Sequence, residues 1–163
     1  MLSKILTSKP VLGAVAGLAV TAVLGSATLA QDLKDPAEYV NARHGYMLMM
    51  AMNLATLGGM AKGETPYDAT AAKMAAATLA SLGGMDTAFL WLPGSEAGKA
   101  QDSSALAPIF TEVDKRNQMF KSLADATAAM QTAAGTDAAS LKGAMAAVGE
   151  ACAACHKAYR QPE

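Results

Sequence analysis

Two cysteines and a histidine stand together near the end of the 163-residue chain, in the run Cys152-Ala153-Ala154-Cys155-His156. C-x-x-C-H is the spacing at which a c-type haem is attached, with both thiols as thioethers and the histidine as an iron ligand. Residues three and four apart share one face of a helix, so the three side chains can meet one flat macrocycle. A thioredoxin-like redox pair and part of a zinc site are the alternatives. No βαβ pattern accompanies the motif and the only other histidine is His44, so the motif favours haem.

The first thirty residues have the pattern of an export signal. Lys4 and Lys9 precede an apolar, uncharged stretch at 11–24, and small residues suit a cleavage site after Ala30. We therefore expect a cleaved signal peptide at 1–30, one domain at 31–163 and no stable membrane span after cleavage. The alternative is a single membrane anchor, because the apolar run that ends at Ala30 approaches the length of a span. Because c-type haem is attached outside the bacterial cytoplasm, the signal and the motif together predict a periplasmic protein.

The charge of the mature domain excludes one class of partner. The whole chain has 13 basic and 14 acidic residues; without Lys4 and Lys9 these become 11 and 14, a net charge of −3. No basic stripe is present that could neutralise phosphates, so the sequence predicts no nucleic-acid binding. It also lacks a lysine-rich docking face, so electrostatic steering of a redox partner, whose identity is unknown, is either weak or favours a basic partner.

The domain is predicted to be all-α. Alanine, methionine, leucine and lysine dominate, and no stretch alternates with the period of a strand. Capping residues, prolines and glycines delimit four helices, at about 36–62, 66–84, 105–133 (its regular part starting at Pro108) and 138–159. A loop containing Trp91 joins the second helix to the third. Short connections at both ends of the chain favour antiparallel neighbours, hence an up-down-up-down four-helix bundle with haem covalently bound to the last helix.

The first helix can cover the second face of that haem. Its apolar positions are spaced by three or four, with a break at Arg43, and are Val40, Met47, Met50, Leu54, Leu57 and Met60. An arginine at the break is expected if its guanidinium reaches a haem propionate. Met47 lies one turn later on the same face and is the best candidate for a sixth, thioether ligand, whereas Met49 and Met52 point elsewhere. Methionine is also a common core residue, which is the alternative for each of these positions.

The mature chain resembles the class II cytochromes c, the cytochrome c′ family of four-helix haem proteins, over essentially its whole length. The matching segments are the C-terminal run from Cys152 to Arg160, Arg43 with the apolar residues after it, Met60-Ala61-Lys62-Gly63-Glu64 with Pro66-Tyr67-Asp68, and Pro93-Gly94-Ser95. A haem motif at the C-terminal end of a helical bundle separates this family from the other large class of cytochromes c.

The resemblance implies a decisive role for the residue four positions after the first-helix arginine, which here is Met47. Members with a methionine ligand at this position are six-coordinate and low-spin. Members with leucine or another non-ligand are five-coordinate and bind nitric oxide or carbon monoxide. The pattern places this chain in the low-spin branch, with His156 and Met47 on iron. His44 stands where many members have glutamine, and it is either a surface residue beside a propionate or a distal histidine ligand.

Two further residues are candidates for contact with the haem. Arg160 follows His156 by one helical turn and can modulate the hydrogen bonding of the imidazole. Its alternative is a solvated arginine at the negative end of the helix dipole. Trp91 lies in the loop where the family places an aromatic residue near the haem, and its alternative is a role in the core.

These observations predict a periplasmic electron carrier with one covalent haem c per chain and no substrate to transform, hence not an enzyme. The alternative is a five-coordinate protein that binds nitric oxide or carbon monoxide under Met47. A homodimer is a further possibility, since the apolar residues Met49 and Met52 suit a helix–helix interface.

Overall fold

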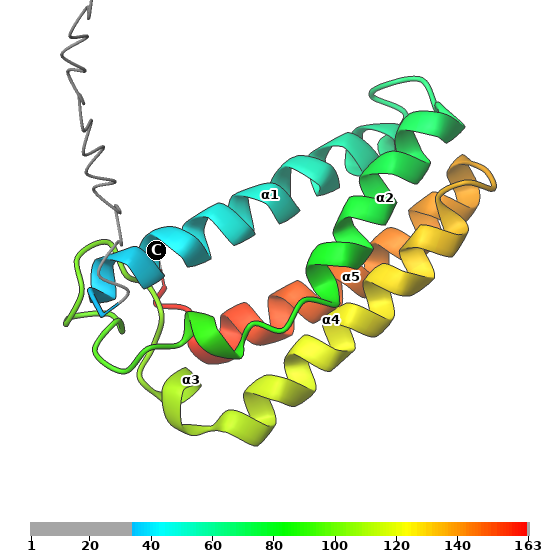
Figure 1. Ribbon diagram of the computed structural model, residues 1–163. Helices are drawn as coiled ribbons and strands as arrows, with labels where there is room; N and C mark the ends of the chain where they lie inside the picture. The colour runs from blue at the N-terminus through cyan, green and yellow to red at the C-terminus, as the bar shows by residue number, and fades with distance from the viewer. Residues whose placement is uncertain (1–33, 163) are drawn as a thin grey trace, which may run out of the picture. The chain divides into compact units, whose positions relative to one another are not determined.

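The computed structural model describes residues 34–162, which form four long helices with short helical pieces between the second and the third (Figure 1). In chain order the elements are α1 (Pro36–Lys62), α2 (Ala69–Gly83), the 3-10 turn η1 (Ala88–Leu90), α3 (Pro108–Thr111), α4 (Val113–Ala133) and α5 (Ala138–Tyr159). The predicted signal peptide at 1–30 lies outside the described residues.

The long helices form a closed ring of neighbours. Helix α1 packs against α2 and α5, and α4 packs against the same two helices. Successive long helices run in opposite directions, and the α1–α2 and α4–α5 turns lie at one end of the bundle (Figure 1). The prediction of an all-α, up-down-up-down bundle is confirmed.

Local sequence signals explain where three of the long helices begin. The side chain of Asp35 accepts a hydrogen bond from Ala37 N and precedes a proline, Asp68 accepts from Thr70 N and Ala71 N, and Asp137 accepts from Ser140 N. Such caps satisfy backbone N–H groups that have no partner inside the helix. Helix α1 ends at Gly63, whose φ of 75° is a left-handed conformation that glycine adopts readily.

The third predicted helix is shorter than expected, and it is broken. We expected it at about 105–133, but Ala105 forms an antiparallel bridge with Arg160, and Leu106 N donates to Tyr159 O at 2.8 Å. These bonds to the end of α5 hold the segment extended, so helix begins only at Pro108, where the regular part was predicted to start. A second break occurs at Glu112, with φ −84° and ψ 58°, which separates α3 from α4.

The buried face of α1 includes four of the predicted apolar positions, Val40, Met50, Leu57 and Met60, and also two side chains that were not predicted to be buried. Arg43 and Tyr46 are 5% and 3% exposed, whereas Met47 is 37% exposed. The buried stripe therefore runs from Val40 through Arg43 and Tyr46 to Met50, at steps of three or four, and Arg43 belongs to it. Met47 lies beside the stripe. Arg43 can belong to it because its guanidinium finds hydrogen-bond acceptors in the loop.

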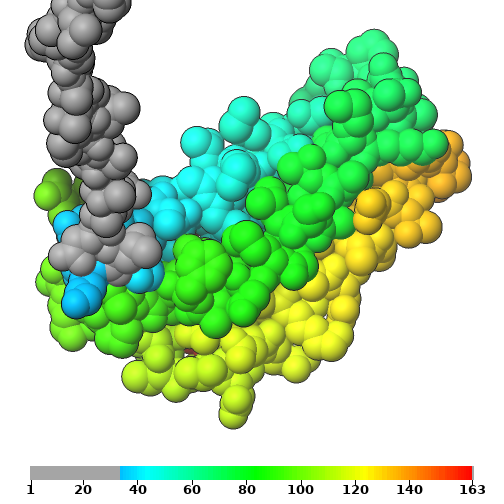
Figure 2. All heavy atoms as spheres, viewed as in Figure 1, coloured from blue at the N-terminus to red at the C-terminus, as the bar shows by residue number. Residues whose placement is uncertain are grey.

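Small side chains let α2 and α4 approach closely. In the space-filling view they run side by side over this face of the bundle (Figure 2). A Cβ added at Gly83 would overlap Thr127 Oγ1 and lie 3.2 Å from Thr127 Cβ. The core beneath contains the fully buried Leu79 and Met130. Among residues 34–162, no helix combines the length and apolarity that crossing a membrane requires.

Candidate haem site

Two cavities of about 420 and 310 Å³ lie between α1, α5 and the loop that follows η1. They share five lining residues, which are Met47, Trp91, Cys155, His156 and Arg160. The larger cavity is closed by polar residues of the 103–104 segment and by the tail after α5. The smaller is lined by apolar side chains of α1 and α4, among them Met50, Leu54, Phe120 and Leu123. The pair of cavities suits a flat ligand with a large apolar body and a polar edge.

The three motif residues lie on the last turns of α5 and face these cavities. Cys152 lines the smaller cavity, and Cys155 and His156 line both. Both thiols are free, and burial raises their pKa values; the neighbouring Cys152 adds to the rise at Cys155. Burial, and then the charge of Arg160, lower the pKa of His156. The neutral imidazole favoured in this way is the form that ligates iron.

No group of three or more His, Cys, Asp and Glu side chains within residues 34–162 could hold a metal ion.

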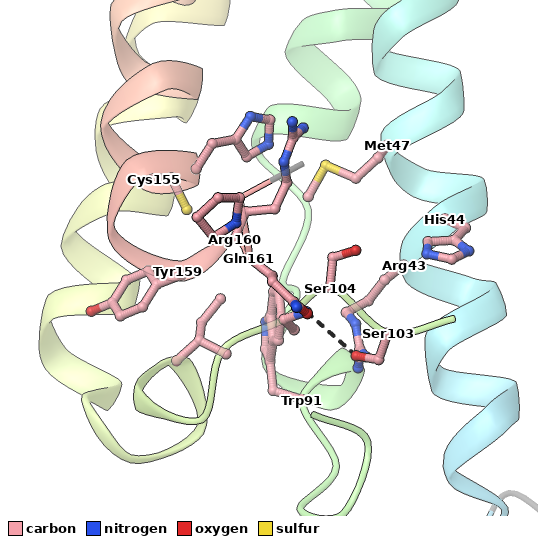
Figure 3. Close-up of a pocket in the computed structure, with 14 residues that line it drawn as sticks. Arg43, His44, Met47, Trp91, Ser103, Ser104, Cys155, Tyr159, Arg160 and Gln161 are labelled. Atoms are coloured by element: carbon pink, nitrogen blue, oxygen red, sulfur yellow. Dashed lines mark hydrogen bonds between the residues drawn. The ribbon is translucent and has the colours of Figure 1, made fainter. Parts of the chain in front are cut away.

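Met47 and His44 approach the site from α1, on the opposite side from the motif. The side chain of Met47 extends from α1 toward α5, whereas His44 stays beside its own helix (Figure 3). Met47 lines both cavities and His44 only the larger one. Met49 and Met52 are 48% and 63% exposed and line neither. Of these three methionines, Met47 lies at the cavities, whereas Met49 and Met52 point elsewhere, as the helical spacing predicted.

Arg43 lines the larger cavity, but its guanidinium is bonded to the loop. Nη1 donates to Leu90 O at 2.9 Å and Ser95 Oγ at 2.8 Å; Nη2 donates to Ser95 O at 2.7 Å and Ser103 Oγ at 3.3 Å. These four bonds use every N–H of the two terminal nitrogens. Burial lowers the pKa of this guanidinium. Arg43 therefore anchors the loop to α1, and its predicted contact with a haem propionate stays a prediction, to which Nε could still contribute.

Trp91 lies between the two cavities and is 9% exposed. Its ring packs against Phe110 and Phe120, with centroids 5.9 and 6.0 Å away. Its Nε1–H is buried and has no acceptor within the described residues. A buried donor without an acceptor is costly, so this atom fits a ligand that brings an oxygen acceptor into the cavity, as the carboxylates of haem would.

Arg160 and the tail after it close the larger cavity. Arg160 caps α5 through its N–H to His156 O at 2.9 Å, and Gln161 N donates to Ser104 O at 2.8 Å. The serines that hold Arg43 and the segment that pairs with this tail were not predicted as site residues. The small polar residues after Pro93-Gly94 were the sequence signal that could have identified these serines. Their partner Arg43, however, lies about fifty positions earlier in the sequence.

The comparison with known proteins supports this site. The family model described as Cytochrome C′ matches residues 38–160. The chain belongs to the cytochrome c′ family. It is 47% identical over 135 residues to cytochrome c-554 of Cereibacter sphaeroides, a match that covers 83% of this chain and 88% of that protein. Members of this family carry haem c covalently, and the two cysteines of this chain meet that requirement.

Two solved cytochrome c′ structures have the same fold. Cytochrome c′ from Rhodobacter Spheriodes is 36% identical, with a TM-score of 0.76 over 79% of this chain and 99% of the other. A ferrous variant of cytochrome c′ from Alcaligenes xylosoxidans with bound NO is 28% identical, with a TM-score of 0.69 over 79% and 98%. The cytochrome c′ relatives are haem proteins rather than typical enzymes.

Proposed function

We propose that this member of the cytochrome c′ family is a periplasmic electron carrier with a six-coordinate haem, held by His156 and Met47. The observation that carries the proposal is that Met47 from α1 and His156 from α5 line the same two cavities. A thioether ligand opposite a histidine raises the reduction potential of a haem. When bound, the haem supplies a reversible one-electron change at its iron.

The residues of the chain would hold and tune this group. Cys152 and Cys155 would form the two thioether bonds, and burial, which lowers the pKa of His156, favours the neutral imidazole that can ligate iron. The apolar lining around Leu54 and Phe120 excludes water from one end of the site. Ligands kept in both oxidation states would give a small reorganisation on electron transfer. Apart from His44, no residue that lines the two cavities suggests an acid–base pair for substrate chemistry, and the relatives are not typical enzymes, so we propose no enzymatic activity.

Export is part of the proposal. The predicted signal peptide supports a periplasmic location, because c-type haem is attached outside the bacterial cytoplasm and two bare cysteines would tend to form a disulfide there. Fusion of residues 1–30 to a reporter that folds only in an oxidising compartment tests this. We expect an active reporter that has been cleaved from the fusion after Ala30. A reporter that stays membrane-bound would instead support the interpretation of this segment as a membrane anchor.

Absorption spectra of purified ferric and ferrous protein test the iron ligands. We expect a low-spin spectrum with a thioether-to-iron charge-transfer band, which Met47→Ala converts to high spin. Met49→Ala is the matched control, since this side chain lines neither cavity, and it should keep the low-spin spectrum. A low-spin spectrum that survives Met47→Ala but not His44→Ala would show histidine ligation from His44 and contradict the proposal.

A second candidate function is the binding of nitric oxide or carbon monoxide at a five-coordinate iron. It is favoured by the similarity to the NO-bound cytochrome c′ variant from Alcaligenes xylosoxidans. Rapid binding of carbon monoxide to a high-spin ferrous protein would support this function and contradict the carrier.

We also propose that the mature protein forms a homodimer through the exposed apolar side chains of α1. Leu48, Met49 and Met52 are 61%, 48% and 63% exposed. Burial of such side chains favours association. Sedimentation of the wild type as a dimer, and of Met52→Glu as a monomer, is the expected result; a monomeric wild type contradicts it.

A further inference from the structure

A second buried arginine, Arg116 on α4, lies beside the haem site. The residue is 6% exposed; its Nη1 donates to Ile109 O at 3.2 Å and its Nη2 to Asn117 Oδ1 at 3.5 Å. Its Nε–H is buried and has no acceptor among residues 34–162. Because a guanidinium stays protonated in proteins, Arg116 holds a full charge in the interior with neutral acceptors alone.

The neighbours of Arg116 form a wall of the haem cavities. Its guanidinium carbon lies 6.0 Å from the centroid of the Trp91 ring, and Trp91 lines both cavities. Ile109, which accepts its hydrogen bond, lines the larger one. The guanidinium carbon of Arg43 lies 5.2 Å from the same ring. One residue layer therefore separates the charge of Arg116 from the site.

The carboxylates of this region are already paired with lysines. Glu96 Oε1 lies 2.5 Å from Lys99 Nζ, and Glu112 Oε2 lies 2.9 Å from Lys115 Nζ. In the described part of the chain neither carboxylate forms an ion pair with Arg116. A buried charge without a counter-charge destabilises a fold, which makes a neutral residue the better choice at position 116 if stability alone mattered.

We propose that Arg116 raises the reduction potential of the haem by holding, behind the wall of its site, a positive charge that has no ion-pair partner among residues 34–162. Reduction of Fe(III) to Fe(II) adds one electron and lowers the charge of the site by one, so a nearby cation stabilises the reduced state. At an effective dielectric constant of about 20, a unit charge about 10 Å away shifts such an equilibrium roughly tenfold. Burial keeps this field from being screened by salt. The inference rests on the haem site of the proposed function but not on Met47 as a ligand.

Redox titration of the haem-loaded protein, followed by its absorption spectrum, tests the proposal. Arg116→Met removes the charge and keeps most of the apolar stem. We expect the Fe(II):Fe(III) ratio at a fixed applied potential to fall about tenfold, equivalent to about 59 mV for one electron. Arg116→Lys, which keeps the charge, should stay within about twofold of the wild type. Lys121→Met removes an exposed charge from the same helix, and should leave the ratio unchanged.

A second variant keeps the arginine in place. Asn117 is exposed, and its side-chain oxygen lies beside Arg116 Nη2, so Asn117→Asp adds a counter-charge without opening the core. We expect the ratio to fall about threefold, while Gln118→Asp, an exposed neighbour, should change it by less than twofold. If Arg116→Met does not fold, Asn117→Asp decides the question alone.

A wild-type ratio in Asn117→Asp, or in a folded Arg116→Met, overturns the proposal. This outcome is distinct from failure of the proposed function. A chain that acquires no covalent haem contradicts the proposed function, whereas a haem-loaded chain with an unchanged potential contradicts only the role of Arg116.

Discussion

Arg43 and Met47 lie one turn apart on α1 and meet different surroundings. The guanidinium is buried because four acceptors of the loop satisfy its terminal N–H groups, and the thioether, which needs no hydrogen bond, faces the cavities. A single turn of helix therefore anchors the loop that carries Trp91 and presents a sulfur atom to the site. Met47 can therefore be replaced without removing the hydrogen bonds by which Arg43 anchors the loop.

Replacing Arg43 is predicted to loosen the loop. Arg43→Ala removes the donor to Leu90 O and Ser95 Oγ and leaves Ser95 O with Ser103 Oγ alone, which should lower the free energy of unfolding by about 2–4 kcal/mol. Urea unfolding followed by circular dichroism measures the change. Asn41→Ala, at an exposed position of α1, should stay within about 0.5 kcal/mol of the wild type. Equal stabilities for Arg43→Ala and the wild type would show that the loop does not depend on this anchor.

At the scale of elements, the end of α5 is tied to the segments on both sides of α3. Leu106 N donates to Tyr159 O at 2.8 Å, and Tyr159 OH donates to Glu112 Oε2 at 2.8 Å. Glu112 is the non-helical residue between α3 and α4, so the break places its carboxylate within reach of α5. The tie holds the C-terminal turn of α5, and with it the motif histidine, against the loop.

This tie is predicted to weaken in acid. Hydrogen bonds from Lys115 and then Tyr159 hold the pKa of Glu112 below its ordinary value, so its stabilising contribution is present above that value and is lost as the pH falls through the lowered pKa. Thermal unfolding of the wild type and Glu112→Gln between about pH 6 and pH 3 should show a difference at pH 6 that vanishes at low pH. Asp114→Asn shows the effect of losing a carboxylate that is not bonded to Tyr159. If the stability difference between the wild type and Glu112→Gln is constant over the whole pH range, the titration of Glu112 is not the cause of the weakening.

At the scale of the whole molecule, the haem site lies at the end of the bundle where the longest connection gathers beside the start of α1 and the end of α5 (Figure 1). The cavities of about 420 and 310 Å³ are bounded by all of these segments. A haem attached to α5 in these cavities would contact α1 and the loop as well. Since a ligand that binds the folded state stabilises it, the fold and the cofactor are coupled.

Removal of the attachment residues tests this coupling. Cys152→Ala/Cys155→Ala is predicted to lose haem on extraction with acidified organic solvent, and to unfold at a urea concentration lower by about 1 M or more. Lys142→Ala, on the exposed side of α5, should keep both the haem and the midpoint of the wild type. Haem retained by the double variant would contradict attachment at these cysteines, and an unchanged midpoint would contradict the coupling.

Most helix boundaries were predictable because their causes are local. Asp35 with Pro36, Gly63 and Asp137 act on the backbone within a few residues, so the bounds of α1 and α5 follow from the sequence. The break at Glu112 was not predicted, and one partner of its carboxylate, Tyr159, lies 47 positions later in α5. The seven residues predicted for the site, namely Arg43, Met47, Trp91, Cys152, Cys155, His156 and Arg160, all line at least one of the two cavities.

The sequence by itself determined the bundle, the motif and the one methionine set apart from its neighbours, since helical periodicity alone puts these residues on particular faces. The tertiary structure decided that Arg43 is buried, that Trp91 lies between the cavities with an unpaired N–H, and that Arg116 lies behind it. The physical reason is that a polar group is buried where acceptors or rings from distant segments meet it. No pattern within α1 or α4 contains those partners.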